Sequence, residues 1–132
     1  VTIKNEQLRN KLKMVFELSN LSIWKYNIQE MEKVKILRYE NGGKYKWHTD
    51  CGSKETSLRK LTAVVQLSDP DNYEGGNLEF GITDKSGKNN YTAPRTRGSI
   101  TVFPAFLSHR VTPITKGRRY SLITWMLGDC FV

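Results

Sequence analysis

The chain has 132 residues, which is enough for one domain with its own hydrophobic core and too few for two. Hydrophobic residues make up 38% of it, with 3 Trp, 6 Tyr and 5 Phe, which excludes a disordered chain, and no apolar run approaches the ~18 residues of a membrane span. The net charge of +8 predicts an anionic partner, but nucleic acid, acidic lipid and a small dianion fit it equally well.

The cysteines and the N-terminus bear on location. Cys51 and Cys130 are far apart in sequence and form no C-x-x-C motif, so we expect no disulfide framework and a reducing, cytoplasmic compartment. The chain starts at Val1 rather than at Met, and no apolar segment typical of a signal peptide follows, which is compatible with a piece of a longer protein.

The first segment predicts a helix with Thr2 as its N-cap. Its apolar residues recur near one face with helical spacing: Ile3, Leu8, Leu12, Val15 and Phe16. Short runs of β-branched and aromatic residues, separated by turn residues, then predict strands. These strands span residues 22–28, 31–39, 45–48, 61–67, 78–82, 99–103, 109–112 and 120–127, with a loop at 69–77 and a polar, mobile segment at 84–90.

This order of elements predicts a mostly β fold. About eight short strands follow one helix, and no helices alternate with them to build a parallel sheet. A β-sandwich, a jelly roll or a barrel with the helix packed outside all fit. We expect one domain over residues 1–132, with the helix and a flanking strand in residues 1–30.

Two histidines and one carboxylate are candidate metal ligands. His48 and Asp50 are two residues apart at the end of a predicted strand, so their side chains point to the same face. His109 lies beside a later strand. Two His and one carboxylate form the facial triad of non-haem Fe(II) oxygenases, which leaves coordination positions open. An H-x-D motif alone is common by chance, so this hypothesis needs context.

A basic segment near the C-terminus supplies candidate anion ligands. Arg119 and Ser121 are two residues apart at the start of the last predicted strand. A guanidinium and a hydroxyl on one strand face can together hold a carboxylate. The alternative is a solvent-exposed basic turn over residues 116–119.

Three segments resemble a known family in content, order and spacing. They are RYENGGKYKWHTD (38–50), LTAVVQLSDPDNYEGGNLEF (61–80) and GSITVFPAFLSHRVTPITKGRRYSLITW (98–125). Together they resemble the Fe(II)/2-oxoglutarate-dependent oxygenases of the prolyl-hydroxylase branch, and within it the PKHD-type hydroxylases of bacteria and phages. The resemblance extends over residues 34–125.

The resemblance implies a double-stranded β-helix (a cupin-like jelly roll) over residues 34–127, with one or two N-terminal helices outside. It implies Fe(II) as cofactor, 2-oxoglutarate and O2 as co-substrates, and ascorbate as a candidate reductant. The residues it assigns are His48, Asp50 and His109 for the metal, Arg119 helped by Ser121 for the distal carboxylate, and Tyr39 for the co-substrate. Gln66 stands where many prolyl hydroxylases have a tyrosine that holds 2-oxoglutarate, and its amide can still donate a hydrogen bond.

The implied reaction is hydroxylation of an unactivated C–H bond, with proline in a peptide or protein as the first candidate, and release of succinate and CO2. A free amino acid or small metabolite is the alternative substrate. Demethylation of nucleic-acid bases is disfavoured, because family members that repair alkylated bases carry a further arginine on the last strand and none follows Arg119. A non-enzymatic module is also disfavoured, since structural zinc sites use four ligands. We expect no membrane partner, and the oligomeric state stays open.

Further residues are weaker candidates. Thr101, Val111 and Trp125 are candidate pocket residues, and Arg59, Tyr45 and Trp47 are candidate substrate contacts. Residues 89–128 contain no acidic residue, and their six cations predict an exposed basic face or a surface that steers an acidic substrate. These cations are Arg95, Arg97, Arg110, Lys116, Arg118 and Arg119.

Overall fold

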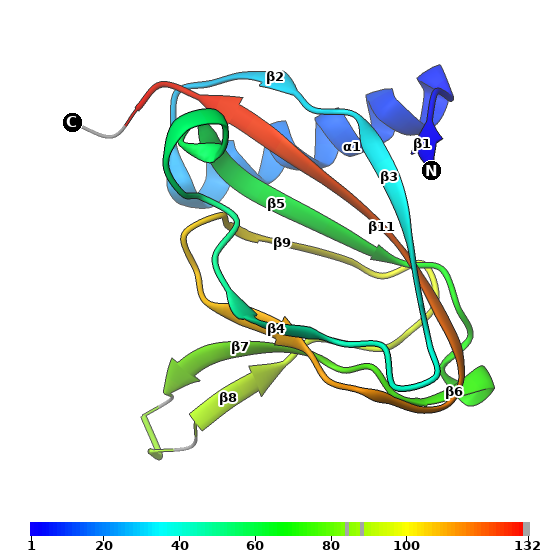
Figure 1. Ribbon diagram of the computed structural model, residues 1–132. Helices are drawn as coiled ribbons and strands as arrows, with labels where there is room; N and C mark the ends of the chain where they lie inside the picture. Colours follow the sequence, from blue (N-terminus) through cyan, green and yellow to red (C-terminus); the bar gives the residue numbers. More distant parts are fainter. Residues whose placement is uncertain (84, 88, 131–132) are drawn as a thin grey trace.

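The computed structural model describes residues 1–83, 85–87 and 89–130, and consists of two antiparallel sheets and one α-helix (Figure 1). The larger sheet contains β1 (Thr2–Ile3), β3 (Val34–Glu40), β11 (Ile114–Gly128), β5 (Arg59–Gln66) and β9 (Ile100–Pro104) in that order, with β2 (Ile28–Met31) and β6 (Tyr73–Gly75) paired to β11. The smaller sheet has the order β4 (Tyr45–His48), β10 (His109–Val111), β7 (Leu78–Thr83) and β8 (Asn89–Thr92). The predicted jelly roll is confirmed.

The helix α1 (Glu6–Ser19) packs on the outer face of the larger sheet. Its Leu12 packs against Val34, Val65 and Leu122 of the strands. Its N-cap is Asn5, whose side chain accepts a hydrogen bond from the Leu8 amide at 2.9 Å. The prediction of Thr2 as cap is therefore wrong, because Thr2 pairs with Lys35 in β1. Within the described residues, no helix is long and apolar enough to cross a membrane.

The strand predicted at 22–28 is also wrong. The helix continues into a π-helical turn, Asn20–Trp24, which ends at Lys25 in the left-handed conformation. The buried Asn20 side chain bonds both the amide and the carbonyl of Tyr26 at 2.8 Å, so it fixes the chain reversal in place of a strand ladder. Only from Ile28 onward does the backbone pair with β11.

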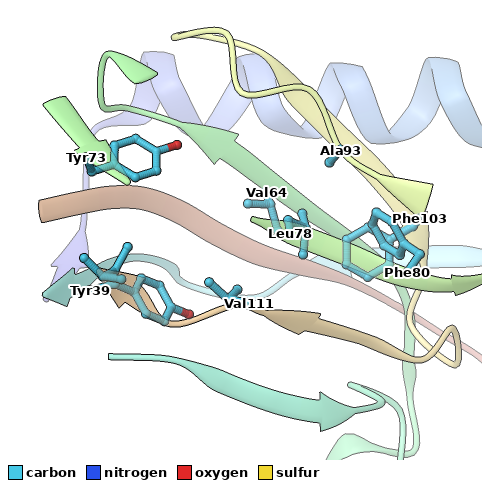
Figure 2. Close-up of a cluster of buried hydrophobic side chains, with 9 residues drawn as sticks. Tyr39, Val64, Tyr73, Leu78, Phe80, Ala93, Phe103 and Val111 are labelled. Carbon is cyan, nitrogen blue, oxygen red and sulfur yellow. The ribbon is translucent and has the colours of Figure 1, made fainter. Parts of the chain in front are cut away.

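Alternation along β11 divides its side chains between two environments. Leu122 and Met126 point outward and pack beneath α1. Arg119, Ser121 and Trp125 point inward and line the space between the sheets. Figure 2 shows the buried cluster inside this space, with Tyr39 and Tyr73 at one end and Phe80 and Phe103 at the other.

The pairing register continues these inward positions across neighbouring strands. Arg119 lies opposite Tyr39, and Ser121 lies opposite both Leu37 and Gln66. At the other end, Trp125 lies opposite Thr62. The inward side chains of neighbouring strands therefore form rows across the interior, with Arg119 and Tyr39 at one end and Trp125 and Thr62 at the other.

Two strands lie where a loop and a polar segment are predicted. β6 falls within the predicted loop 69–77, and β8 begins within the segment 84–90, of which residues 84 and 88 lie outside the described part. Both strands form through pairing rather than through their own apolar pattern: β6 pairs with the distant β11, and β8 pairs with β7, the strand before it in the chain. Gly117 permits the first pairing, because at φ +74° it lies directly against the Asn72 carbonyl.

Replacement of Gly117 tests this close approach. Gly117→Ala adds a methyl group against the Asn72 backbone as well as left-handed strain, so we expect it to lower the free energy of unfolding by about 3 kcal/mol. Gly42→Ala is the matched control, since Gly42 has φ +81° but nothing within 4 Å, and should lose only about 1 kcal/mol. Urea denaturation measures both values, and equal losses would contradict the steric explanation.

Candidate metal and co-substrate site

The structure brings the three predicted metal ligands together. His48 of β4 and His109 of β10 are direct partners across the smaller sheet, and Asp50 follows β4 by two residues. Asp50 Oδ1 lies 3.3 Å from His48 Nε2 and 3.4 Å from His109 Nε2. The three ligand atoms all lie within 4.8 Å of one another, so one cation can contact all of them.

Backbone carbonyls orient both imidazoles. His48 Nδ1 lies 2.7 Å from the Lys46 carbonyl, and His109 Nδ1 lies 2.8 Å from the Leu107 carbonyl. Because a carbonyl oxygen only accepts, each Nδ1 carries the hydrogen and donates it. With the hydrogen on Nδ1, Nε2 of each ring faces Asp50: a protonated ring donates from it to the carboxylate, and a neutral ring offers its lone pair there to a metal.

Asp50 is buried and ionised. Its Oδ2 accepts a hydrogen bond from the fully buried Thr62 hydroxyl at 2.8 Å, which leaves Oδ1 directed toward the histidines. Burial by itself would raise the pKa of this carboxyl, but hydrogen bonds from His109 and His48 outweigh burial and hold the pKa well below its usual range. The site therefore offers one carboxylate oxygen and two imidazole nitrogens.

A cavity of about 450 Å³ connects this triad with the predicted anion ligands. That volume lies within the usual range of small-molecule sites. The lining includes His48, Asp50, His109, Tyr39, Arg119 and Ser121, together with apolar side chains of Val64, Leu78, Val111 and Trp125. The three candidate metal ligands and the Arg119 guanidinium thus line the same cavity.

Arg119 is buried without an anionic partner. Its side chain is 1% exposed, and its Nε and Nη2 atoms have no hydrogen-bond partner. In the described part of the chain, no carboxylate forms an ion pair with it. Burial lowers the pKa of Arg119, and Tyr39 and Tyr73 oppose that change. Because burying an unpaired charge is costly, this guanidinium fits a ligand that brings a carboxylate.

The other predicted site residues divide into two groups. Arg59 and Tyr45 line the cavity with Val111 and Trp125. Gln66, Thr101 and Trp47 are not among its lining residues. Gln66 is buried opposite Ser121, and its Oε1 has no partner. Trp47 lies under the Arg110 guanidinium, 4.8 Å from its ring centre.

Several of the basic residues are engaged within the protein. Arg110 pairs with Glu79 at 2.7 Å, and Arg118 pairs with Glu40 at 2.6 Å. Arg95 donates to the carbonyl of Gly75 at 2.7 Å. With Arg119 buried at the cavity, three of the six cations in residues 89–128 (Arg95, Arg110 and Arg119) are at least partly buried, whereas Arg118 stays exposed, as the predicted basic face requires.

Sequence reasoning missed Thr62 and Tyr73. Thr62 is the polar residue among the otherwise apolar residues 61–65, and strand alternation could have placed it on the inward face beside Asp50. Tyr73 lies in a predicted loop, and its position beside Arg119 depends on the pairing of β6 with β11. That pairing has no local signal.

The Thr62 hydroxyl can be tested separately from the fold. Thr62→Val removes the hydrogen bond to Asp50 while keeping the side-chain volume, and we expect about tenfold weaker Mn(II) binding, since partners of metal ligands orient them. Thr124→Val is the matched control, because this equally buried hydroxyl donates to the Glu32 carbonyl at 3.0 Å instead. Titration calorimetry measures the affinity, and equal effects of both changes would argue against the orienting role.

The comparisons with known proteins agree with this geometry. Residues 34–127 match the family model of the 2OG-Fe(II) oxygenase superfamily. A PKHD-type hydroxylase of Teredinibacter turnerae is 28% identical over 137 residues, which cover 92% of this chain and 59% of that protein. A PKHD-type hydroxylase of Pseudomonas fluorescens is 34% identical over 93 residues, which cover 66% of this chain and 39% of that protein. The chain thus spans about half the length of these relatives.

Solved structures share the fold. A Pseudomonas putida prolyl-4-hydroxylase superposes with a TM-score of 0.78 at 20% identity, covering 98% of this chain and 71% of the other. A Trichoplax adhaerens prolyl hydroxylase in complex with a hypoxia-inducible-factor peptide fragment gives 0.74 at 17% identity, covering 92% and 55%. By sequence, fold and donor set, the chain belongs to the 2OG-Fe(II) oxygenase superfamily, whose members use Fe(II), 2-oxoglutarate and O2.

Proposed function

We propose that this chain is a dioxygenase that uses Fe(II) and 2-oxoglutarate to hydroxylate a prolyl or other side chain of a peptide. The observation that carries the proposal is the pairing of two groups in one cavity. A His–Asp–His cluster lies at one part of the wall, and a buried guanidinium without an anionic partner lies at another. A 2-oxo dicarboxylate has a metal-chelating end and an anionic end, so it complements both.

His48, Asp50 and His109 would hold the metal. Two imidazoles and one carboxylate suit Fe(II) and leave positions for other ligands. When bound, iron supplies the oxidising chemistry by activating O2 as 2-oxoglutarate loses CO2 to give succinate, and one oxygen atom enters the substrate C–H bond. The protein contributes a fixed donor set, because the Lys46 and Leu107 carbonyls and the Thr62 hydroxyl each hold one ligand in orientation.

Arg119 would bind the distal carboxylate. Its free Nε and Nη2 atoms can donate two hydrogen bonds to one carboxylate. Ser121 and Tyr39 line the same cavity next to it and are proposed as further donors. Gln66 is proposed only as an indirect support, because it lies beside Ser121 without lining the cavity.

A peptide fits the shape better than a free amino acid. A second hollow of about 370 Å³ lies beside the main cavity, and the two share the side chains of Lys35, Arg59 and Trp125 in their walls. Glu32 of the second hollow pairs with Arg59 at 3.0 Å, and the Arg59 guanidinium stacks 3.7 Å above Trp125. Two adjoining hollows give room for residues that flank the reacting one. The prolyl-hydroxylase relatives support the same substrate class.

The remaining expectations are part of the proposal. Ascorbate is a candidate reductant. A cytoplasmic location is supported by Cys51 and Cys130, which are both free thiols. Pairing of Arg110 with Glu79 and of Arg118 with Glu40 argues against a nucleic-acid substrate, because it reduces the positive surface charge that would attract phosphates.

Anaerobic titration tests the metal and co-substrate roles. We expect Fe(II) and 2-oxoglutarate together to produce a weak visible charge-transfer band, and His109→Ala to abolish it. No band with the unaltered protein would contradict the proposed function.

The role of Arg119 has its own prediction. Arg119→Gln removes two charge-assisted hydrogen bonds and should weaken 2-oxoglutarate binding about 100-fold with Mn(II) affinity unchanged. Arg118→Gln is the control, since the neighbouring Arg118 is exposed and pairs with Glu40. Calorimetry on the Mn(II)-loaded protein measures both, and similar losses would mean a general charge effect.

Substrate class is tested by coupled turnover. We expect proline-containing peptides, but not free proline, to raise succinate release and to gain 16 mass units per hydroxylation (one oxygen atom) by mass spectrometry. Peptides with alanine at the same position are the control. Stimulation by free amino acids alone would transfer the assignment to a small-molecule hydroxylase, and stimulation by methylated oligonucleotides would transfer it to a demethylase.

A further inference from the structure

Unpartnered buried polar atoms concentrate at the Arg119 end of the interior. Among the described residues, such atoms belong to Gln66, Tyr73, Ser99 and Arg119, and to Trp125 at the opposite end. Gln66 and Ser99 are backbone hydrogen-bond partners at 3.0 Å. Buried polar groups usually have partners, so a group of exceptions calls for a physical explanation. The anionic ligand proposed above accounts for Arg119 but not for the Tyr73 hydroxyl, because Tyr73 does not line the cavity.

Tyr73 lies directly behind Arg119. The two side chains meet around Gly76, where a Cβ atom would be 3.1 Å from Arg119 Cδ and 3.4 Å from Tyr73 Cε2. Such an atom would also collide with Ile114. Gly76 therefore leaves the space in which the ring and the guanidinium stem pack together. Tyr39 covers another side of Arg119, with 5.3 Å between the guanidinium carbon and the ring centre.

Arg95 holds both the ring and the backbone of Tyr73. Its guanidinium carbon lies 4.3 Å from the Tyr73 ring centre, and its Nη2 donates to the Tyr73 carbonyl at 3.3 Å. Its Nη1 donates to the carbonyl of Gly75 at 2.7 Å and to the side chain of Asn77. Figure 2 shows the Tyr73 and Tyr39 rings at one end of the cluster with their hydroxyl groups directed toward its middle. Ring and backbone are thus fixed, and only the hydroxyl lacks a partner.

We propose that Tyr73, clamped by Arg95, is a positioning residue that fixes the Arg119 guanidinium for the distal carboxylate of 2-oxoglutarate. This inference rests on the proposed function. The phenol oxygen can accept from the inner edge of the guanidinium, which leaves the outer edge aligned with a carboxylate. Alignment matters because two-point binding of a carboxylate by arginine depends on the orientation of its plane. Electrostatic coupling of Tyr73 to the Arg119 charge agrees with this contact.

Removal of the hydroxyl tests the proposal. Tyr73→Phe in the Mn(II)-loaded protein should weaken 2-oxoglutarate binding about tenfold and leave unchanged the affinity for 2-oxobutyrate, which lacks the distal carboxylate. In turnover, KM for 2-oxoglutarate should rise with kcat unchanged. Tyr120→Phe is the matched control, because Tyr120 adjoins Arg119 on the opposite face of β11.

Two further readouts separate positioning from a structural role. The melting temperature of the ligand-free Tyr73→Phe protein should stay close to that of the unaltered protein, since the Tyr73 hydroxyl makes no close hydrogen bond before a carboxylate orients the guanidinium. In an Arg119→Lys background, Tyr73→Phe should have no further effect on 2-oxoglutarate affinity, because its effect passes through the guanidinium.

The outcomes are distinct. A lower melting temperature with equal loss for both oxo acids would overturn the proposal in favour of a packing role. An additive loss in the Arg119→Lys background would replace it with direct contact between Tyr73 and the ligand. Unchanged 2-oxoglutarate affinity in Tyr73→Phe would overturn it while the proposed function stands. Absence of 2-oxoglutarate binding by the unaltered protein would overturn both.

Discussion

The site depends on the hydrogen-bonding register of β11 between β3 and β5. That register places Arg119, Ser121 and Trp125 inside and Leu122 and Met126 under the helix. Side chains of a strand alternate between faces, so a slip of one residue would exchange the two sets. It would bury a guanidinium against the helix and direct leucine into the cavity. Packing of α1 against β11 therefore helps to keep Arg119 and Ser121 facing the cavity.

The two buried charges of the cavity are balanced in different ways. Asp50 is stabilised from within the protein, by two imidazoles and the Thr62 hydroxyl. Arg119 lies near the Tyr39 ring, its Nε and Nη2 atoms lack partners, and no carboxylate of the described residues pairs with it, so its charge is not balanced within that part of the chain. Under the proposed function, a cavity with one satisfied anion and one unsatisfied cation would favour ligands that carry a negative charge at a defined distance from a metal-binding group.

The sequence predicts most of this arrangement, and its errors have physical reasons. Strand alternation places His48 with Asp50 and Arg119 with Ser121 on shared faces, the residue types add His109 to the candidate metal ligands, and the family resemblance assigns their roles. The N-cap prediction fails because Thr2 and Ile3 pair with β3 instead of joining the helix. The strand predicted at 22–28 fails because one buried side chain, Asn20, satisfies the backbone of Tyr26. Tyr73 could not be found from local pattern, since its position depends on a pairing between segments about 40 residues apart.

β4 lies at one edge of the smaller sheet, and this position bears on the order in which metal and co-substrate would bind. In the described part of the chain, β4 pairs with β10 alone, so it is an edge strand that opens locally more easily than its neighbours. A cation bound by His48, Asp50 and His109 would join this edge to β10 and close a loop of about 60 residues. Metal binding would then act as a cross-link on local unfolding, and the co-substrate would enter a cavity whose wall the metal has already made rigid.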